Sequence, residues 1–425
     1  MPTTYLDNNA TTPLAPEVIE TIRDAAERLY ANPSSVHRPG QEVRQQIELA
    51  RQQVALLLGS EPREITFTSG GTEANNLALR GLIEPELWHR AMNGPWNPED
   101  ADESTAPAVV TLPVEHSAVR DPAKHLHRHG AELRMADVDH DGRVSPNAIA
   151  AILDELTPGD ASGGGGRTVV VSIQWANNET GVLQPVAEIG DIIAAKREAL
   201  RGVGIMRPRL FFHIDATQAV GKVPVDVNES KADLLTCSAH KIHGPKGSGA
   251  LYVRRLVKLS ALQLGGSQER ERRPGTENTI GILALGKAAE LARVHLANTD
   301  ECDTIRKRRD RFEQAICERI PSAVVNSAGA PRLSNTASIA FPGVEAEAIL
   351  LGLSERGVCA SAGAACSSGS LEPSSVLTAM HLDEPTAHGT VRFSLSRYTT
   401  DTDIDHALEV VPAVVERLMK VLPTG

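Results

Sequence analysis

The sequence predicts an α/β protein with a mainly parallel sheet, followed by a smaller α+β domain. Short apolar runs alternate with helix-length segments through the first two thirds of the chain, an order typical of parallel strands covered by helices. After about residue 265 the alternation stops, and a long helical stretch precedes two further strand-like runs. With 425 residues the chain is long enough for two domains.

The expected strands of the first part are short and almost entirely apolar. The run Thr168–Ile173 is nearly all β-branched and apolar, which suits a strand that is buried on both faces. Further strands are expected at 65–68, 108–113, 210–215 and 250–253, with helices between them such as 40–58 and 188–200. These elements predict a large domain over residues 16–264.

The second part has a different pattern. A helical stretch is expected from Ile280 to about Ile320, strands at 337–341 and 391–395, and a closing helix at 402–418. We expect these elements to form a small domain over residues 265–425. The N-terminal segment 1–15 is expected to join the two domains.

Composition narrows the class of function. A formal net charge of −11 argues against nucleic acid as a partner, because phosphate binding needs a basic face. The basic run 306–311 alternates with acidic residues and is interpreted as a solvated helix face. The five cysteines are odd in number and form no CxxC pair, which favours a reducing compartment. The N-terminus shows no signal peptide and no run is long enough to span a bilayer, so we expect a cytoplasmic protein without a membrane partner.

Two motifs resemble ligand sites but lack a required residue. Asp137–Gly142 begins like a calcium loop, yet Ala148 stands where the bidentate glutamate is due. Gly281–Ala288 approaches a phosphate-binding loop, but it lacks the final hydroxyl residue and has a helical pattern. We interpret them as a polar turn and a helix packing surface, and we expect no metal site.

Three other segments carry candidate chemistry. Gly70-Gly71-Thr72 follows a strand and opens a helix, a place where backbone N–H groups favour an anion; a plain strand-to-helix turn is the alternative. Asp215 ends an expected strand, where α/β sheets bind ligands, although it could also be a helix cap. Lys241 lies on a Gly/Pro-rich segment, and a lysine in a packed pocket can lose its proton and attack a carbonyl.

These three groups together suit pyridoxal 5'-phosphate. The phosphate would bind at the glycine turn, the ring nitrogen at Asp215 and the aldehyde at Lys241. Each segment is a weak signal alone, and their order and spacing make the combined signal stronger.

At these residues the chain resembles the cysteine desulfurases of the nitrogen-fixation and iron–sulfur-cluster-assembly type, which belong to the class V aminotransferases. The resemblance runs from Tyr5 to about residue 420 and includes the segments 5–13, 68–73, 114–119, 175–182, 213–218, 240–241, 273–278 and 391–395. It implies the pyridoxal-phosphate transferase fold of type I, with a seven-stranded sheet in the large domain. A serine at position 267 stands where relatives commonly have a third glycine.

The resemblance also implies roles for single residues. Lys241 would bind the cofactor covalently, and His116 would stack on its ring and move protons. Arg392 would bind the substrate carboxylate with its forked donors, and Asn178 would lie near the ring hydroxyl and the substrate. The remaining cofactor contacts would come from Gly71, Thr72, Asp215, Gln218, Ser238 and His240, and from Thr276, which would reach the phosphate of the second subunit of a homodimer.

The stretch 360–370 contains a single cysteine, Cys366, among Gly, Ala and Ser. The resemblance implies that its thiolate attacks the sulfur of bound L-cysteine, holds that sulfur as a persulfide and leaves alanine. A small-residue loop would let the thiol reach both the cofactor and an acceptor protein, such as an iron–sulfur scaffold. The attack requires a thiolate.

Three alternatives remain open from the sequence. A selenocysteine lyase would not need the Cys366 thiol, and neither would another class V aminotransferase-type enzyme. A scaffold without activity would not need Lys241, His116, Asp215 and Arg392 together. The final sulfur acceptor is not specified.

Overall fold

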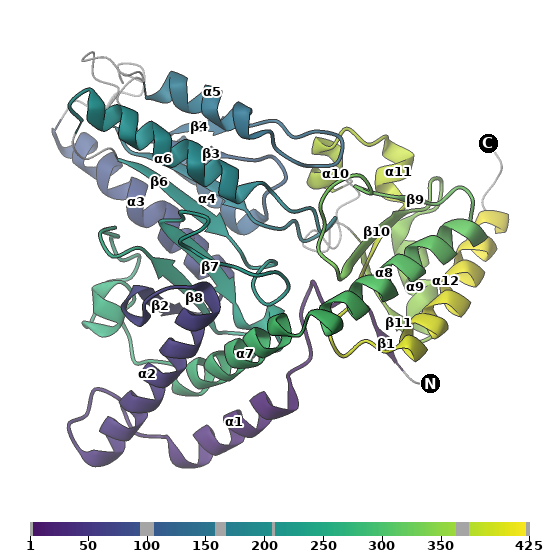
Figure 1. Cartoon of the computed structure of the whole chain (residues 1–425), viewed down its shortest axis with the longest axis horizontal. Coiled ribbons are helices and arrows are strands. Elements are labelled where there is room, and N and C mark those ends of the chain that lie inside the picture. The colour runs from purple at the N-terminus through teal and green to yellow at the C-terminus, as the bar shows by residue number, and fades with distance from the viewer. Residues whose placement is uncertain (1–2, 94–105, 158–166, 206–208, 363–373, 422–425) are drawn as a thin grey trace.

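The computed structural model describes residues 3–93, 106–157, 167–205, 209–362 and 374–421. In Figure 1 these residues form two lobes side by side, each built around its own sheet. The larger lobe has a hydrophobic core on each face of its sheet, and the smaller lobe has a core of its own. The predicted combination of an α/β part with a smaller α+β part is therefore confirmed.

The large sheet has seven strands and is mainly parallel, as predicted. Its order is β2 (Ile65–Thr68), β8 (Gly249–Val253), β7 (Leu234–Ser238), β6 (Leu210–Asp215), β5 (Val169–Gln174), β3 (Ala108–Thr111) and β4 (Glu132–Met135). Strand β8 is antiparallel to both of its neighbours, and the other pairs are parallel. The sequence pattern did not predict β4 or β7. Strand β4 contains two charged residues and is only partly buried, so it lacks the apolar run of a buried strand.

Helices cover both faces of this sheet because alternate strand residues point to opposite sides. Val109 and Val170 belong to one core with α3 (Gly71–Asn93) and α4 (Ser117–Arg128). Val110 and Val171 belong to the other. That second core also contains residues of α1 (Pro16–Arg28), α2 (Arg38–Leu58), α5 (Pro146–Leu156), α6 (Val186–Gly202) and α7 (Thr279–Ala297).

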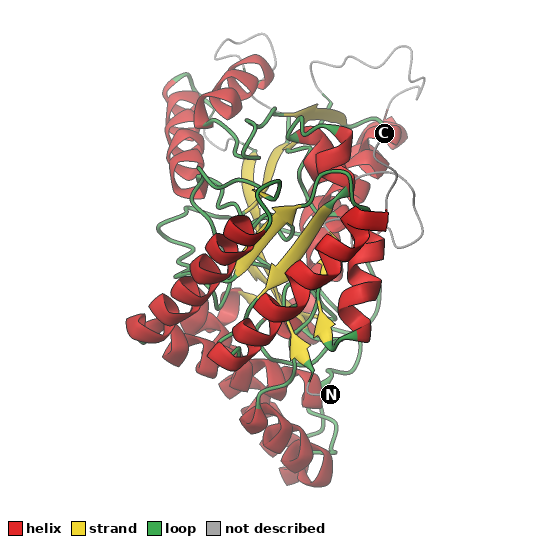
Figure 2. Cartoon of the chain, turned by 90° about the vertical axis from the view of Figure 1, so that its right-hand side faces the viewer, coloured by secondary structure: helices red, strands yellow, loops and turns green. Residues whose placement is uncertain are grey.

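The smaller lobe has an antiparallel sheet in the order β12 (Ser361–Ala362), β13 (Thr390–Ser394), β10 (Thr336–Ala340) and β9 (Val324–Val325). Its core adds α8 (Thr299–Arg319), α9 (Ala346–Glu355) and α12 (Asp401–Val421). Figure 2, which looks onto this side of the molecule, shows helices and strands packed together there. Strand β1 (Thr4–Tyr5) pairs with β11 (Val358–Cys359), so the N-terminus belongs to this lobe. The short helices α10 (Ser375–Ala379) and α11 (Glu384–His388) contribute to the core of the larger lobe.

The prediction of one helix from Ile280 to Ile320 is wrong, because the stretch divides at Asn298. This residue has a non-helical backbone, and its Oδ1 accepts a hydrogen bond from the N–H of Glu301 as the cap of α8. The first half, α7, packs in the core of the larger lobe although it lies beyond residue 264. The domain limits 16–264 and 265–425 stay a prediction. Because α7 packs with the larger lobe, we propose that the small domain begins near α8.

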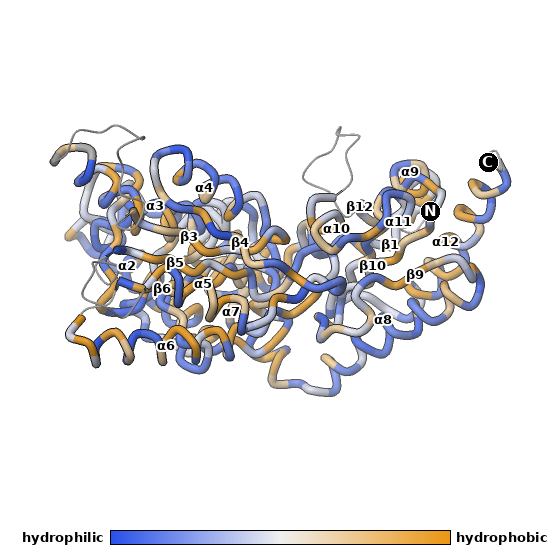
Figure 3. Tube along the Cα trace, turned by 90° about the horizontal axis from the view of Figure 1, so that it is seen from above, coloured by the Kyte–Doolittle hydropathy of each residue, from blue (hydrophilic) through white to orange (hydrophobic). Residues whose placement is uncertain are grey.

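The two motifs that lack a required ligand residue have the local structures predicted for them. The segment 137–142 forms a tight turn bridged between Val138 and Val144, and 281–288 lies inside α7. Most of the basic run lies on a polar face of α8, where Arg308 contacts Asp401 and Arg311 contacts Asp405. Arg309 departs from this prediction, because it is buried and donates to the backbone oxygen of Leu333. In Figure 3, α8 is mostly hydrophilic, whereas the strands of the large sheet are mostly hydrophobic. Among the described residues, no helix combines the length and apolar character needed to cross a bilayer.

A buried ion pair connects α2 to the segment that follows the large sheet. The guanidinium of Arg51 donates two hydrogen bonds of 2.8 Å to the carboxylate of Glu269, which also accepts from the N–H of Phe67 in β2. The exposed fractions of the two side chains are 5% and 3%. Removing one partner would leave the other charge buried and unpaired.

We therefore expect Glu269→Gln to lower the free energy of unfolding by about 3 kcal/mol in urea denaturation. Glu290→Gln is the control, because Glu290 pairs with Lys287 on the surface and its loss should cost about 0.5 kcal/mol or less. Equal changes in the two variants would contradict the role of the buried pair.

Candidate active site

A pocket of about 320 Å³ lies at the carboxyl ends of β5, β6 and β7, where it also receives residues of the smaller lobe. Ten of the residues predicted for the site line it: Gly71, Thr72, His116, Asn178, Asp215, Gln218, Ser238, His240, Lys241 and Arg392. Thr276 does not line it and is exposed. Cys366 lies outside the described residues. The position at the strand ends is the one that α/β sheets use for ligands.

One side of the pocket is suited to a phosphate group. Helix α3 begins at Gly71, and a Cβ there would lie 3.0 Å from the Oγ1 of Thr217. The hydroxyl oxygens of Thr217 and Ser238 are buried and have no hydrogen-bond partner within the described residues. Buried hydroxyls are normally satisfied, so two orphaned hydroxyls beside a helix N-terminus fit an anionic ligand.

His240 lines the same pocket in an uncharged form. Its pKa is lowered to about 4 by burial and by the positive charges of Lys241, Lys246 and Lys222. Its Nδ1 lies 3.3 Å from the Oγ1 of Thr11. A neutral imidazole can still donate one hydrogen bond to a ligand.

Asp215 is fixed at the end of β6. Its Oδ2 accepts from the amide of Asn75 at 2.7 Å and its Oδ1 from the N–H of Thr217 at 3.0 Å. Behind it, the ring of His213 lies between the hydroxyls of Ser172 and Thr236. Burial lowers the pKa of His213 to about 4, so this ring is neutral at pH 7 and does not cancel the carboxylate charge. The carboxylate can therefore pair with a cationic ring nitrogen in the pocket.

Lys241 lies in the short helix η4 (Ala239–Lys241), directly after β7. Its Nζ donates to the backbone oxygens of Asn9 at 2.6 Å and Ala10 at 2.8 Å. The N-terminal segment thus holds the amine at the wall of the pocket.

Arg392 reaches the pocket from β13 of the smaller lobe and is only 2% exposed. Its Nη1 donates to the backbone oxygen of Asn178 at 2.9 Å, and its Nη2 donates to Asp7 at 2.8 Å. His116 caps α4, where its Nδ1 accepts from the N–H of Ala118 at 3.0 Å. Because Nδ1 is an acceptor, the proton of the neutral ring lies on Nε2.

Several residues of the site were not predicted. Asn9, Asn75 and Thr217 line the pocket, and Asp7 is the ion-pair partner of Arg392. Asn75 follows Thr72 by three residues and therefore shares its helix face, a signal that was available in the sequence. The position of Asp7 had no such signal, because its partner is 385 residues away.

The residues present fit a phosphorylated, cationic aldehyde. The described residues offer buried hydroxyls without partners at a helix start, a fixed carboxylate at a strand end and an amine in the same pocket. They contain no group of three or more His, Cys, Asp or Glu that could hold a metal ion.

Comparisons with known proteins show the family of the chain. Residues 4–407 match the profile of the family described as Aminotransferase class-V. The chain belongs to this family. A cysteine desulfurase of Trichormus azollae is 45% identical over 421 residues, which cover 99% of this chain and 94% of that one. The cysteine desulfurase IscS of Methanosarcina thermophila is 40% identical, over 99% of this chain and 93% of its own. A solved NifS-like protein is 31% identical, with a TM-score of 0.82, 98% of this chain covered and 100% of that chain.

Membership in the class V family brings pyridoxal 5'-phosphate as the cofactor. The seven-stranded sheet and the solved NifS-like neighbour agree with the predicted transferase fold of type I. The roles of single residues at this cofactor remain predictions.

A second buried carboxyl group lies near the pocket. The side chain of Glu179 accepts a hydrogen bond from the hydroxyl of Ser374, which caps α10. Burial raises the pKa of Glu179 to about 7, although Ser374 and the charges of Arg392 and His116 oppose the rise. The folded protein therefore holds this proton more tightly than the unfolded chain does.

It follows that Glu179 should make the protein less stable as the pH rises from about 4.5, its ordinary pKa, to about 7. We expect Glu179→Gln to remove this loss, which is at most about 3 kcal/mol. Urea denaturation between pH 4.5 and 8 checks it. The exposed Glu416→Gln is the control and should keep the slope of the wild type; a variant at position 179 with an unchanged slope would refute the assignment.

Proposed function

We propose that the protein is a pyridoxal-phosphate-dependent cysteine desulfurase. It converts L-cysteine to L-alanine and transfers the sulfur to Cys366 as a persulfide for iron–sulfur cluster assembly. Relatives named cysteine desulfurase that match nearly the whole chain support the reaction and the substrate.

One observation carries the proposal. A single pocket holds Lys241, Asp215 and Arg392, from three separate parts of the chain, beside the orphaned hydroxyls of Thr217 and Ser238. The amine and the carboxylate match the aldehyde and the ring nitrogen of pyridoxal phosphate. The guanidinium matches the carboxylate of an amino-acid substrate.

We assign the cofactor contacts from this arrangement. Asp215 would face the ring nitrogen, and Lys241 would bind the aldehyde. The phosphate would be held by Gly71, Thr72, Ser238 and His240, together with Thr217, and Gln218 would face the ring hydroxyl. When bound, pyridoxal phosphate withdraws electrons from the Cα of an attached amino acid and makes its proton acidic.

The remaining residues act on the substrate. Arg392 would pair with the carboxylate of L-cysteine, because it lines the pocket and its buried Nε has no hydrogen-bond partner within the described residues. The amine of Lys241 takes the Cα proton. His116, with its proton on Nε2, can move a proton at the substrate, and Asn178, which lines the pocket beside Arg392, would contact the substrate.

Sulfur transfer balances without a further reagent. The thiolate of Cys366 attacks the substrate sulfur, so an S–S bond forms and the C–S bond breaks. The electron pair of that bond stays with the carbon, which takes up a proton and leaves as alanine. The sulfur remains on Cys366 as the terminal atom of a persulfide.

We also propose a cytoplasmic homodimer that passes this sulfur to a scaffold protein. Thr276 is exposed and outside the pocket of its own chain, a position from which it could reach the phosphate site of a second subunit. The four described cysteines form no disulfide with one another, which supports a reducing compartment.

Lys241→Ala should lose covalent attachment of the cofactor. After borohydride reduction, we expect the wild-type protein to carry the added mass of the reduced cofactor on Lys241 and the variant to carry none. Lys246→Ala is a matched control, because this exposed lysine lies five residues further on. Retention of the mass in Lys241→Ala would show that another lysine binds the cofactor.

Cys366→Ala should keep the visible absorbance of the cofactor and lose both alanine release and persulfide in a single turnover with L-cysteine. We expect a fall of at least ~100-fold, since no thiolate is left to accept the sulfur. Cys359→Ala is the control and should retain both products. Unchanged alanine release in Cys366→Ala would refute the role of this thiol and favour a lyase reaction.

A further inference from the structure

Lys222 is a buried lysine that the proposed reaction does not use. It follows Gln218 by four residues in the turn after β6. Its Nζ donates to the Oδ1 of Asn9 at 2.8 Å and to the Oε1 of Gln218 at 2.5 Å.

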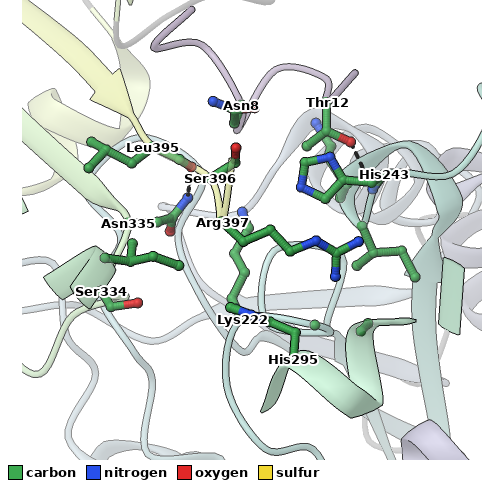
Figure 4. Close-up of a pocket in the computed structure, with 15 residues that line it drawn as sticks. Asn8, Thr12, Lys222, His243, His295, Ser334, Asn335, Leu395, Ser396 and Arg397 are labelled. Carbon is green, nitrogen blue, oxygen red and sulfur yellow. Dashed lines mark hydrogen bonds between the residues drawn. The ribbon is translucent and has the colours of Figure 1, made fainter. Parts of the chain in front are cut away.

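Lys222 approaches Gln218 from behind the cofactor pocket. It lines a separate cavity of about 40 Å³, where Figure 4 shows it with Arg397 and His295 beside it. Gln218 lines the larger pocket, and Lys241 lines both. The amide of Gln218 therefore lies between Lys222 and the place proposed for the cofactor ring.

The contacts determine which way round this amide lies. The Nε2 of Gln218 donates to the backbone oxygen of Asn9 at 2.9 Å, and a carbonyl oxygen can only accept. Lys222 donates its hydrogen bond on the other side of this amide, so the group that faces it must be Oε1. A flipped amide would bring Oε1 against the Asn9 oxygen and would remove the hydrogen bond to Lys222.

The orientation of Asn9 is fixed in the same way. Its Nδ2 donates to the backbone oxygen of Asn178 at 3.2 Å and to the hydroxyl of Thr336 at 2.9 Å. Its Oδ1 must therefore face Lys222, where it also accepts from the amide of Asn335. Lys222 thus donates to the oxygen atoms of two amides whose nitrogens already donate to other acceptors.

Burying a lysine side chain at position 222 costs desolvation free energy. Burial, together with the nearby positive charges of Lys241 and Arg392, holds the pKa of Lys222 well below its usual range. In the described part of the chain, both oxygens that accept from it belong to neutral amides. An apolar side chain would avoid the desolvation cost, so packing alone does not explain the amine. The two hydrogen bonds of Lys222 explain the amine, and an amine can donate both whether or not it carries the third proton.

We propose that Lys222 is a positioning residue that fixes the amide of Gln218 so that its second N–H, rather than its carbonyl oxygen, faces the ring hydroxyl of pyridoxal phosphate. The inference rests on the proposed cofactor site. An N–H in this place stabilises the deprotonated ring oxygen, whereas a carbonyl oxygen would repel it. Lys222 thereby controls the acidity of the bound cofactor without touching it.

The test compares Lys222→Met with Lys222→Arg, in the wild-type background and in a Gln218→Ala background. Two quantities are measured: the pH midpoint of the visible absorbance of the bound cofactor, and the dissociation constant of pyridoxal phosphate for the cofactor-free protein. In Lys222→Met we expect the midpoint to rise by roughly one unit, because the ring oxygen loses its donor. We expect affinity for the cofactor to fall about tenfold, a factor typical of lost supporting contacts, and Lys222→Arg to restore most of both.

The Gln218→Ala background separates orientation from charge. If Lys222 acts through Gln218, Lys222→Met should shift the midpoint little further in that background. An equal shift in both backgrounds would overturn the proposal, because the lysine charge would then act directly on the cofactor; so would the absence of any shift. If Lys222→Met does not fold, as judged by its melting temperature, Lys222→Gln replaces it in the same cycle. Failure of the proposed function would look different, since the wild-type protein itself would then show no visible band or release no alanine.

Discussion

The N-terminal segment between the two lobes is the constraint on which the site depends. Its backbone accepts from Lys241 through the oxygens of Asn9 and Ala10, and the N–H of Thr12 donates to the oxygen of His240 at 2.9 Å. On its other side, the N–H of Asn8 donates to the oxygen of Ser394 at 3.2 Å. A short turn and the few residues after it thus hold the amine of one lobe and the strand β13 of the other in a fixed relation. Arg392 lies on that strand, and its Nη2 also donates to Asp7 of this segment.

The same region brings three basic side chains close together. Lys222, Lys241 and Arg392 lie close enough for the charges of the last two to lower the pKa of the first, and Asp7 is the carboxylate that pairs with Arg392. Such a pocket attracts an anionic amino acid and a phosphate, because each relieves the repulsion among the cations. It also favours amide groups as neighbours, since their oxygens solvate a cation without needing a charge of their own. The side-chain oxygens of Asn9 and Gln218 and the backbone oxygens of Asn9 and Ala10 accept from the two lysines. Because these acceptors are neutral, Asp215 is not needed to bind a lysine and can face a ring nitrogen.

Much of the fold was predictable because many strands and helices follow from the local order of apolar and polar residues. The buried strand predicted at 168–173 is found at Val169–Gln174, and the closing helix predicted at 402–418 is found at Asp401–Val421. The errors arose where packing overrides local pattern. The break at Asn298 depends on a single cap within an otherwise helical stretch. The placement of α7 in the larger lobe depends on its contacts with α1 and α2, which no local signal reveals.

By itself, the sequence determined the kinds of chemical group available and their order: a glycine turn before a helix, an aspartate ending a strand, and a lysine in a Gly/Pro-rich segment. These features are local, since each depends on residues within one strand, turn or helix start. The tertiary structure decided which groups meet. It brought Asp7 to Arg392 and Asn75 to Asp215, and it set the direction in which Gln218 presents its amide. Those contacts join residues hundreds of positions apart or depend on a donor facing an acceptor across the fold, and only the packed chain specifies such geometry.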